Sequence, residues 1–399
     1  MKRYLSQLCF VSPTVIGRGD PLLLLTTMRL QRWLLIYAIA VYLLVCWCLF
    51  FLYVQPSFTN ENNLRIGADS QTYLNIAGYV GSIKGTKQED VALVTLSGNL
   101  LGPVLVATLT QSLWGIALFN TLLFVLSLWI ASHLPGVRLG PFFCLLVLNP
   151  TLIPALLTLN KEILSLVGAI LFVRYVTSER KTPLQLLLLL GVSLLARWEQ
   201  AAVTGVVLVL SSPRSPLKHR RKSVIVALIL MITLAYPVLV RSGMADIADM
   251  IAFAGEGSTG PLLNNIQASY GFPLVIIPKV MVNLFGHLLS PSLFISDFFV
   301  QDPSDIQIYF VLPLHCLAMF LIVVVAAVKK KLTLKKPTIY WCAIYQVVTA
   351  VSPVLQTRYQ YPVYVILCLE LSGLNLMTST FTQQARRFHK RHFRTALTN

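Results

Sequence analysis

Long apolar runs alternate along the chain with short polar segments. In lipid, a run of this kind can satisfy its backbone hydrogen bonds only as a helix. Since a span takes about 20 residues, the pattern predicts an all-α polytopic membrane protein with about ten transmembrane helices. The predicted spans are residues 33–54, 113–134, 139–157, 163–177, 183–196, 199–211, 224–240, 306–328, 338–352 and 360–378.

Basic residues gather in four segments between or after these runs. Because Lys and Arg in short loops mark the cytoplasmic side of a membrane protein, we place all four segments and both termini in the cytoplasm. The acidic residues fall mainly on or beside the segments left outside, which supports the same orientation. The basic segments are 180–181, 214–222, 329–336 and 386–394, and the exterior segments are 55–112, 158–162, 197–198, 241–305 and 353–359.

This orientation divides the chain into two membrane modules. The N-terminal module spans residues 33–211 and the C-terminal module residues 224–378, and each includes one long exterior loop. The chain has no Asn-x-Ser/Thr sequon with an allowed middle residue, which favours a bacterial inner (plasma) membrane. Basic cytoplasmic segments precede, join and follow the modules, at residues 1–32, 212–223 and 379–399.

Composition supports a membrane protein over a soluble one. Hydrophobic residues make up 56% of the 399 residues and charged residues 12%, against roughly 25% charged in a soluble domain. The net charge of +17 fits basic cytoplasmic loops, and no nucleic-acid-binding motif accompanies it, so we expect no nucleic-acid partner. Most cysteines lie inside apolar runs, which predicts core thiols rather than a disulfide framework.

The first exterior loop contains a candidate catalytic residue, Asp69. Apolar residues recur at helical spacing from Tyr73 to Val80, which predicts an amphipathic helix on the membrane surface. At the start of that helix, Asp69 has two compatible interpretations: an N-cap that accepts a backbone amide, or a general base at the membrane–water boundary. A second surface helix is predicted further along the loop, with Pro103 in its first turn.

Two short exterior turns carry charged pairs. Lys161 and Glu162 interrupt two apolar runs, where they either mark a span boundary or bind substrate, Lys161 through a phosphate and Glu162 through a metal or a sugar hydroxyl. Arg197 and Glu199 separate two further runs. Charge here is costly unless the groups pair with each other, snorkel or face a wet cavity. An anionic substrate is the functional alternative for Arg197, whose planar fork suits phosphate.

The C-terminal module adds weaker candidates for substrate binding. Arg358 and Tyr359 precede the last span, where they either anchor the chain at the lipid headgroups or clamp a phosphate. Lys279 and His287 lie in an apolar stretch of the second exterior loop that either lies on the membrane surface or dips into it. The sequence contains no phosphate-cradling glycine loop, zinc signature or Ser-His-Asp set.

The layout of residues 30–210 resembles the GT-C superfamily of membrane glycosyltransferases. The resemblance rests on a first outer loop with an acid and a surface helix, a proline-led second surface helix, and a short second outer loop with an acid. It implies a polyprenyl-phosphate-linked sugar donor, Asp69 as the first-loop base and Glu162 as the second-loop acid. Ser70 follows Asp69 where the family has a second acid, so a Mg²⁺ or Mn²⁺ ion on Asp69 and Glu162 is an alternative rather than a requirement. The expected lack of a soluble C-terminal domain argues against oligosaccharyl transfer.

We therefore expect an inverting glycosyltransferase that moves a sugar from a polyprenyl phosphate to a glycan or glycolipid acceptor at the outer face of the bilayer. Asp69 would take the acceptor proton, and Lys161, Arg197 and Arg358 would neutralise the departing phosphate. One alternative is a repeat-unit polymerase of surface polysaccharide, of the O-antigen or capsule type. A second is a lipid-linked glycan transporter or flippase, which would need ionisable residues along a path through the spans; Glu370 is the main deep acid.

Overall fold

The computed structural model describes residues 21–56, 70, 73–74, 100–241, 259–289, 310–352 and 357–373. Within these ranges the protein is helical and contains no strand, which confirms the all-α prediction for this part of the chain. Two of the described helices are long and apolar enough to cross a membrane, Leu30–Val54 and Leu113–Ser132. Further apolar helices are shorter.

The helix boundaries follow the apolar runs closely. Most predicted spans coincide with an observed helix to within a few residues, including residues 183–196, where the two agree at both ends. The helices are α2 (Pro21–Leu49) with its π-helical continuation η1 (Phe50–Val54), α6 (Leu101–Thr110), α7 (Leu113–Ser132), α8 (Leu139–Val147), α9 (Leu152–Leu157), α10 (Glu162–Thr177), α11 (Pro183–Ala196), α12 (Trp198–Leu210), η2 (Pro216–His219), α13 (Arg221–Arg241), α15 (Thr259–Tyr270), α16 (Phe272–Leu289), α18 (Leu312–Val328), α19 (Pro337–Val351), η4 (Thr357–Gln360) and α20 (Tyr361–Leu371).

One predicted span is interrupted in the structure. The expected span 139–157 is two helices, α8 and α9, because Pro150 has no amide hydrogen to continue the helical ladder. The Asn149 side chain accepts the Thr151 amide at 3.1 Å and so stabilises the break. The first helix begins at Pro21, whereas its stretch that is apolar enough to cross a membrane begins at Leu30, close to the predicted start at residue 33.

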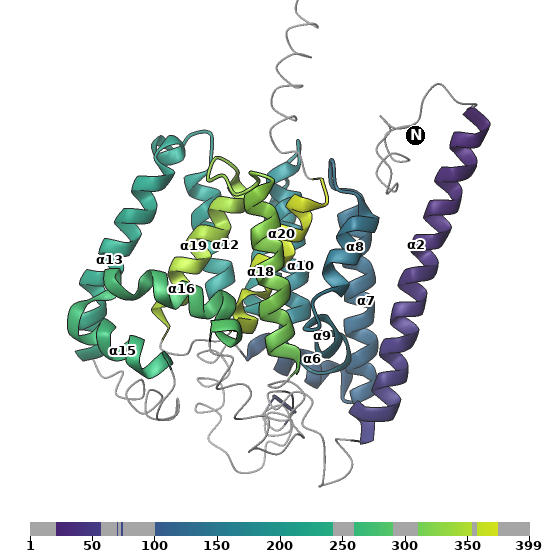
Figure 1. Cartoon of the computed structure of the whole chain (residues 1–399), viewed down its shortest axis with the longest axis horizontal. Helices are drawn as coiled ribbons and strands as arrows, with labels where there is room; N and C mark the ends of the chain where they lie inside the picture. Colours follow the sequence, from purple (N-terminus) through teal and green to yellow (C-terminus); the bar gives the residue numbers. More distant parts are fainter. Residues whose placement is uncertain are drawn as a thin grey trace, which may run out of the picture.

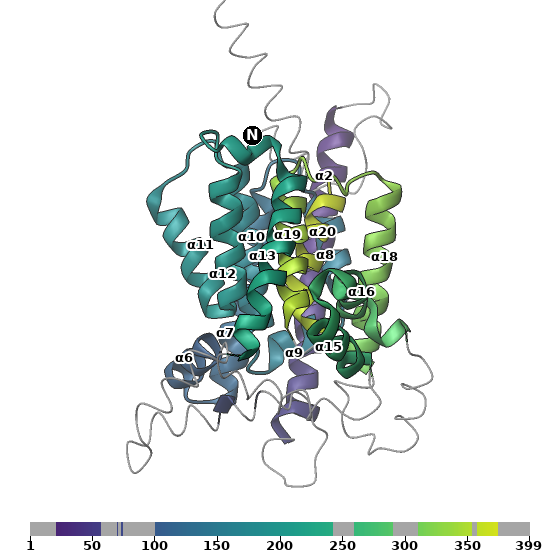
Figure 2. The ribbon, with the colours of Figure 1, turned by 90° about the vertical axis from the view of Figure 1, so that its left-hand side faces the viewer.

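Most of the long helices run side by side along one axis, and α16 lies across them (Figures 1 and 2). Helices α10, α19 and α20 form the centre, where nearly every side chain is buried. Large side chains such as Trp341 and Tyr345 fill the space between α19 and α12. The Trp341 indole N–H donates to the Thr204 hydroxyl at 3.0 Å, which satisfies the polar atom of a buried ring.

The outer faces of the bundle expose large apolar side chains. On α2, residues such as Trp33 and Leu44 are more than half exposed, and Leu122 on α7, Leu187 on α11 and Leu234 on α13 are exposed to a similar degree. Soluble proteins seldom expose apolar surface in this quantity, whereas lipid tails favour it. This surface is consistent with helices that face lipid.

The two ends of the bundle differ in charge. The connections α10–α11, α12–α13 and α18–α19 lie at one end, which is uppermost in Figure 1, and these are the segments that hold the basic clusters. Helices α6 and α15 lie at the opposite end (Figures 1 and 2). Helices α10, α12 and α20 also begin there, and they position the candidate site.

Where the second surface helix is predicted, the structure has a helix, α6, with Pro103 in its first turn. It packs against the end of α11 through Gly102. A Cβ atom at this glycine would overlap the Leu195 carbonyl oxygen and would lie 2.7 Å from a methyl group of Leu164. Since real contacts of this kind are never so short, only glycine allows α6 to approach α11 this closely.

Replacing Gly102 with alanine is therefore expected to lower the free energy of unfolding by about 1–3 kcal/mol, because α6 must move away from α11. Thermal denaturation of the purified protein in detergent measures the change. Gly191→Ala is the matched control: it lies within α11, and a Cβ atom there meets nothing within 4 Å. The control should be neutral or slightly stabilising, because alanine favours the helix. Equal Tm values for the two variants would show that the α6–α11 contact is not tight.

Candidate functional site

Three cations from separate parts of the chain meet around the ring of Tyr359, and Glu162 pairs with one of them; we call these four residues and Tyr359 the Tyr359 cluster. They are Lys161, Glu162, Arg197, Arg358 and Tyr359. The guanidinium carbon of Arg197 lies 3.9 Å from the ring centroid, the Lys161 ammonium 5.7 Å and the guanidinium carbon of Arg358 6.0 Å. An aromatic face attracts cations within about 6 Å. One ring therefore collects the three cations that the sequence suggests for phosphate binding.

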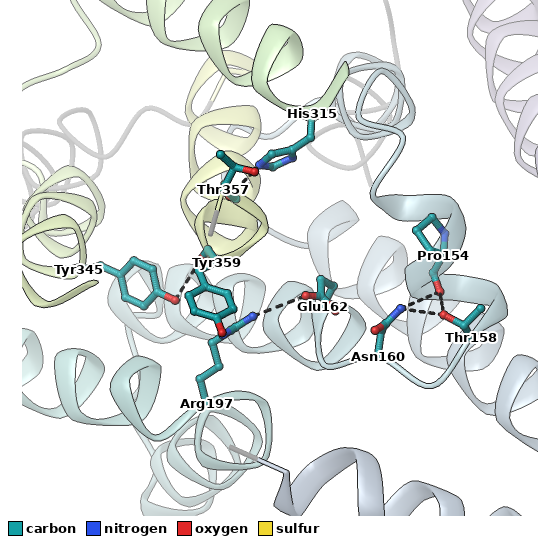
Figure 3. A network of polar contacts seen from close by, with 9 residues as sticks. All are labelled: Pro154, Thr158, Asn160, Glu162, Arg197, His315, Tyr345, Thr357 and Tyr359. Atoms are coloured by element: carbon teal, nitrogen blue, oxygen red, sulfur yellow. Dashed lines mark hydrogen bonds and ion pairs between the residues drawn. The ribbon is translucent and has the colours of Figure 1, made fainter. Parts of the chain in front are cut away.

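Arg197 enters the cluster because it is the single residue between α11 and α12. Its backbone is extended, with φ −162° and ψ 135°, and its N–H donates to the Ser193 carbonyl at 2.8 Å. The guanidinium points to Glu162, with 3.5 Å between Nη2 and Oε1 (Figure 3). Both side chains are at most 5% exposed. Arg197 is thus buried instead of snorkelling, and it forms an ion pair with Glu162, a residue distant in the sequence.

A buried polar network fixes the segment that carries Lys161 and Glu162. Thr158 donates its hydroxyl to the Pro154 carbonyl at 2.7 Å, and Asn160 donates its amide to the Thr158 hydroxyl at 2.7 Å (Figure 3). The Asn120 side chain of α7 donates to the Thr158 carbonyl at 2.9 Å. These bonds hold a non-helical turn rigidly against α7 and α9, so the first residues of α10 have a defined position.

Tyr359 is held by its backbone, which leaves its ring free for the cations. The Tyr345 hydroxyl donates to the Tyr359 carbonyl at 3.1 Å. Two residues earlier, the Thr357 carbonyl lies 3.0 Å from Nε2 of His315, a fully buried residue on α18 (Figure 3). Nδ1 of the same imidazole contacts the Asn149 side chain at the α8–α9 break. The turn η4 is therefore tied to both α18 and the break between α8 and α9.

Helix N-termini add positive potential to the cluster. α10 begins at Glu162, α12 at Trp198 directly after Arg197, and α20 at Tyr361 directly after η4. Each N-terminus carries a partial positive charge from its unpaired amides. Burial lowers the pKa of Arg197, but Tyr345, Tyr359 and Glu162 outweigh it and raise the pKa above its ordinary value, so the guanidinium stays charged.

Two charged groups at the centre have unused hydrogen-bonding atoms. Among the described residues, Glu162 Oε2 and Arg197 Nε are buried and have no hydrogen-bond partner. An unsatisfied buried atom of a charged group costs more than about 1–3 kcal/mol. A ligand that accepts from Arg197 and donates to Glu162 would remove this cost. A phosphate oxygen fits the first requirement and a sugar hydroxyl the second.

The remaining predicted site residues are not part of the described cluster. Asp69 lies outside the described residues, but the next residue, Ser70, is buried and donates its hydroxyl to the Leu159 carbonyl at 3.1 Å. Lys279 is buried on α16 and donates to the Ser352 carbonyl at 3.3 Å instead of facing the Tyr359 ring. The backbone of His287 belongs to α16, and its side chain lies outside the described part.

The structure adds residues that the sequence does not single out. His315 and Thr158 support the cluster, yet each is a lone polar residue beside apolar runs and gives no pattern to recognise. Tyr73 belongs to the first predicted surface helix, and its ring centroid lies 5.9 Å from the Lys161 ammonium. Glu370, the deep acid, lies near the end of α20; its carboxylate accepts from the Lys336 ammonium at 2.5 Å and the Thr338 hydroxyl at 2.6 Å.

The described donors do not suit a divalent cation. In the part of the chain that the structure describes, no group of three or more His, Cys, Asp or Glu side chains could hold a metal ion. At the cluster, Glu162 faces a guanidinium, and the next residue toward the N-terminus is a lysine. Mg²⁺ and Mn²⁺ require several oxygen ligands. We therefore derive no step through a metal.

Comparisons with protein-family models, with curated proteins and with solved structures find no match to this chain.

Proposed function

We propose that the protein is a multi-pass membrane glycosyltransferase of GT-C type, which transfers a sugar from a polyprenyl-phosphate donor to a hydroxyl of a glycan or glycolipid. One observation carries the proposal: Lys161, Arg197 and Arg358, distant in sequence, gather around one aromatic ring next to a buried carboxylate. A phosphate is the ligand that this set of charges recognises best, because its oxygens accept from both guanidinium and ammonium groups.

The proposed orientation rests on the charge of the two bundle ends. The basic connections lie at the end where α2 begins and α20 ends, which we assign to the cytoplasm (Figure 1). The Tyr359 cluster then belongs to the outer face of a bacterial inner membrane. The apolar side chains exposed on α2, α7, α11 and α13 would contact lipid. A polyprenyl chain could then stay in the bilayer while its phosphate enters between the helices.

In the proposed reaction, the acceptor hydroxyl oxygen attacks the anomeric carbon of the donor sugar. The new carbon–oxygen bond forms as the bond to the phosphate oxygen breaks, and the electron pair of that bond leaves on the phosphate. Asp69 takes the hydroxyl proton, and a single displacement inverts the anomeric centre. The products are a glycoside and a polyprenyl phosphate with one more negative charge.

The cluster would act on the leaving group. Arg197, Arg358 and Lys161 would donate hydrogen bonds to the phosphate as its charge develops, in a site where burial makes each charge more effective than in water. The starts of α10, α12 and α20 add fixed dipoles of the same sign. Glu162 would orient Arg197 through one carboxylate oxygen and would leave the other for a sugar hydroxyl.

Transfer by the purified protein tests the proposal. Reconstituted in liposomes, the protein should move labelled sugar from a polyprenyl-phosphate hexose or pentose to a lipid-linked glycan, without added nucleotide sugar. A strain that lacks the gene should make surface glycan of full length that lacks one sugar. Loss of glycan length with unchanged composition would instead support a repeat-unit polymerase, and accumulation of complete lipid-linked glycan inside the cell would support a flippase.

A further inference from the structure

His315 joins parts of the chain that are far apart in the sequence and that lie behind the Tyr359 cluster. It belongs to the first turn of α18 and is fully buried. Nε2 of its imidazole lies 3.0 Å from the Thr357 carbonyl oxygen, and Nδ1 lies 2.8 Å from the side-chain nitrogen of Asn149. Figure 3 shows the ring directed at Thr357, in the turn that contains Tyr359. One side chain therefore connects α18, η4 and the α8–α9 break.

These contacts define the tautomer of the imidazole. A carbonyl oxygen can only accept a hydrogen bond, so Nε2 carries the proton and donates to Thr357. The Asn149 Oδ1 accepts the Thr151 amide and lies 3.1 Å from Nδ1, further away than the Asn149 nitrogen. That nitrogen can only donate, so Nδ1 accepts from it. Because the bond at one ring nitrogen sets the proton position at the other, Asn149 selects the tautomer that donates to Thr357.

The turn that receives this hydrogen bond carries two members of the cluster. Thr357 is buried, whereas the next two residues, Arg358 and Tyr359, are partly exposed. Partly exposed groups can meet a ligand, but they keep one position only when their backbone is supported. Tyr345 supports η4 from α19 through the Tyr359 carbonyl, and His315 supports it from α18 through the Thr357 carbonyl.

The imidazole itself is held firmly by its surroundings. Its ring centroid lies 6.3 Å from that of Tyr364 on α20, the helix that begins directly after η4. The Tyr364 hydroxyl donates to the Leu145 carbonyl of α8 at 2.5 Å. The ring therefore lies between α8, α20 and η4. Support of this kind matters for a reaction, because a misplacement of about 1 Å can lower a rate about 10²-fold.

We propose that His315 is a positioning residue for the sugar transfer proposed above. As a neutral imidazole it donates from Nε2 to the Thr357 carbonyl, and this bond fixes Arg358 and Tyr359 where they meet the donor phosphate. Asn149 contributes by holding the ring in the required tautomer. The role in transfer rests on the proposed function, whereas the support of η4 rests on the contacts of His315 alone.

Two amide substitutions separate this role from a general contribution to the fold. The side-chain nitrogen of His315→Gln can take the place of Nε2 and donate to Thr357, whereas His315→Asn ends at the place of Nδ1 and reaches only Asn149. Each variant keeps one of the two hydrogen bonds, so we expect similar Tm values. His315→Gln should transfer sugar within about threefold of the native rate, and His315→Asn should lose at least tenfold, because only the first holds η4. Labelled transfer in liposomes and thermal denaturation in detergent measure the two properties.

Two further measurements follow the effect through the cluster. In His315→Leu, amide hydrogen exchange of a peptide that covers residues 357–360 should be at least tenfold faster, because η4 opens more readily. His315→Leu should lower transfer at least tenfold in the native background but less than about threefold in Tyr359→Leu, where the ring that needs positioning is absent. His133→Leu is the matched control. His133 is exposed after the last residue of α7 and contacts the Trp129 carbonyl of that helix, so both properties should stay native.

The proposal is wrong if His315→Gln and His315→Asn lose transfer equally, or if the effects of His315→Leu and Tyr359→Leu on the rate simply multiply. Native exchange of residues 357–360 in His315→Leu would also overturn it. The glutamine and asparagine variants keep the test valid if the leucine variant does not fold. If exchange rises but transfer stays native, the positioning role fails and the proposed function stands. If exchange rises and the native protein transfers no sugar, the support of η4 stands and the proposed function fails.

Discussion

Replacing Arg197 with glutamine is expected to lower sugar transfer by about 10²–10³-fold and to destabilise the fold. The transfer rate falls because Arg197 would donate to the phosphate as negative charge develops, and removal of one such donor typically has this effect. The stability falls by about 3–5 kcal/mol, because Glu162 is left buried without its counter-ion. Labelled transfer in liposomes and thermal denaturation in detergent measure the two effects.

A double variant separates the two roles of Arg197. In Arg197→Gln with Glu162→Gln, neither charge is buried, so most of the lost stability should return. Transfer should stay low, because the phosphate still lacks its donor. Arg197→Lys should preserve most of the stability but not the rate, since an ammonium has no planar fork for two phosphate oxygens.

The control is Arg180→Gln, which removes an exposed arginine at the opposite, basic end of the bundle. It should change neither transfer nor Tm. Restored transfer in the double variant would show that Arg197 serves only to neutralise Glu162, and the phosphate role would then be wrong. The double variant also keeps the test informative if Arg197→Gln alone does not fold.

Most helices of this protein can be predicted from the sequence, because the residues that start and end each helix are adjacent to its apolar run. For α11, Thr182 caps the first turn and Pro183 begins the helix, so both residues that start it are adjacent in the chain. The break between α8 and α9 is not predicted, although Asn149 and Pro150 are both breakers. The apolar residues on either side give the run an uninterrupted appearance.

The composition of the candidate site can be predicted, but its pairing cannot. Lys161, Arg197 and Arg358 stand out because charge is rare and costly in apolar surroundings. Which acid pairs with Arg197 depends on how α10 packs against α11 and α12. The sequence suggests Glu199, two residues away in the chain, whereas the structure shows an ion pair with Glu162. The central position of the Tyr359 ring cannot be predicted either, because an aromatic residue before a span also fits a position at the lipid headgroups.

Neutral polar residues are the hardest to predict. His315 lies inside an apolar run and gives no signal, yet it ties η4 to α18 and α8. Asn149 is an ordinary helix breaker by composition, and only its burial beside His315 shows its second contact. A lone polar residue becomes informative when the structure shows which distant groups it bonds to, and that information is not local to the sequence.

Asp69→Asn is expected to lower the rate of transfer by about 10²–10⁴-fold, the usual contribution of a general base. This substitution distinguishes the general base from the helix cap, because asparagine caps a helix as well as aspartate does. It removes the base and keeps the cap, whereas Asp69→Ala removes both. If Asp69 is a base, the two variants should lose transfer equally; if it is only a cap, asparagine should retain transfer and alanine should not.

Ser70, the residue after Asp69, links this part of the chain to the candidate site. Ser70 donates its hydroxyl to the Leu159 carbonyl, in the segment that leads to Lys161 and Glu162. Asp69, which lies outside the described residues, directly precedes this anchored serine in the chain. Glu179→Gln, which removes an exposed acid beyond the far end of α10, is the control and should transfer at the native rate. Native transfer by Asp69→Asn, in protein that inserts normally, would contradict the base assignment and leave phosphate binding as the contribution of the cluster alone.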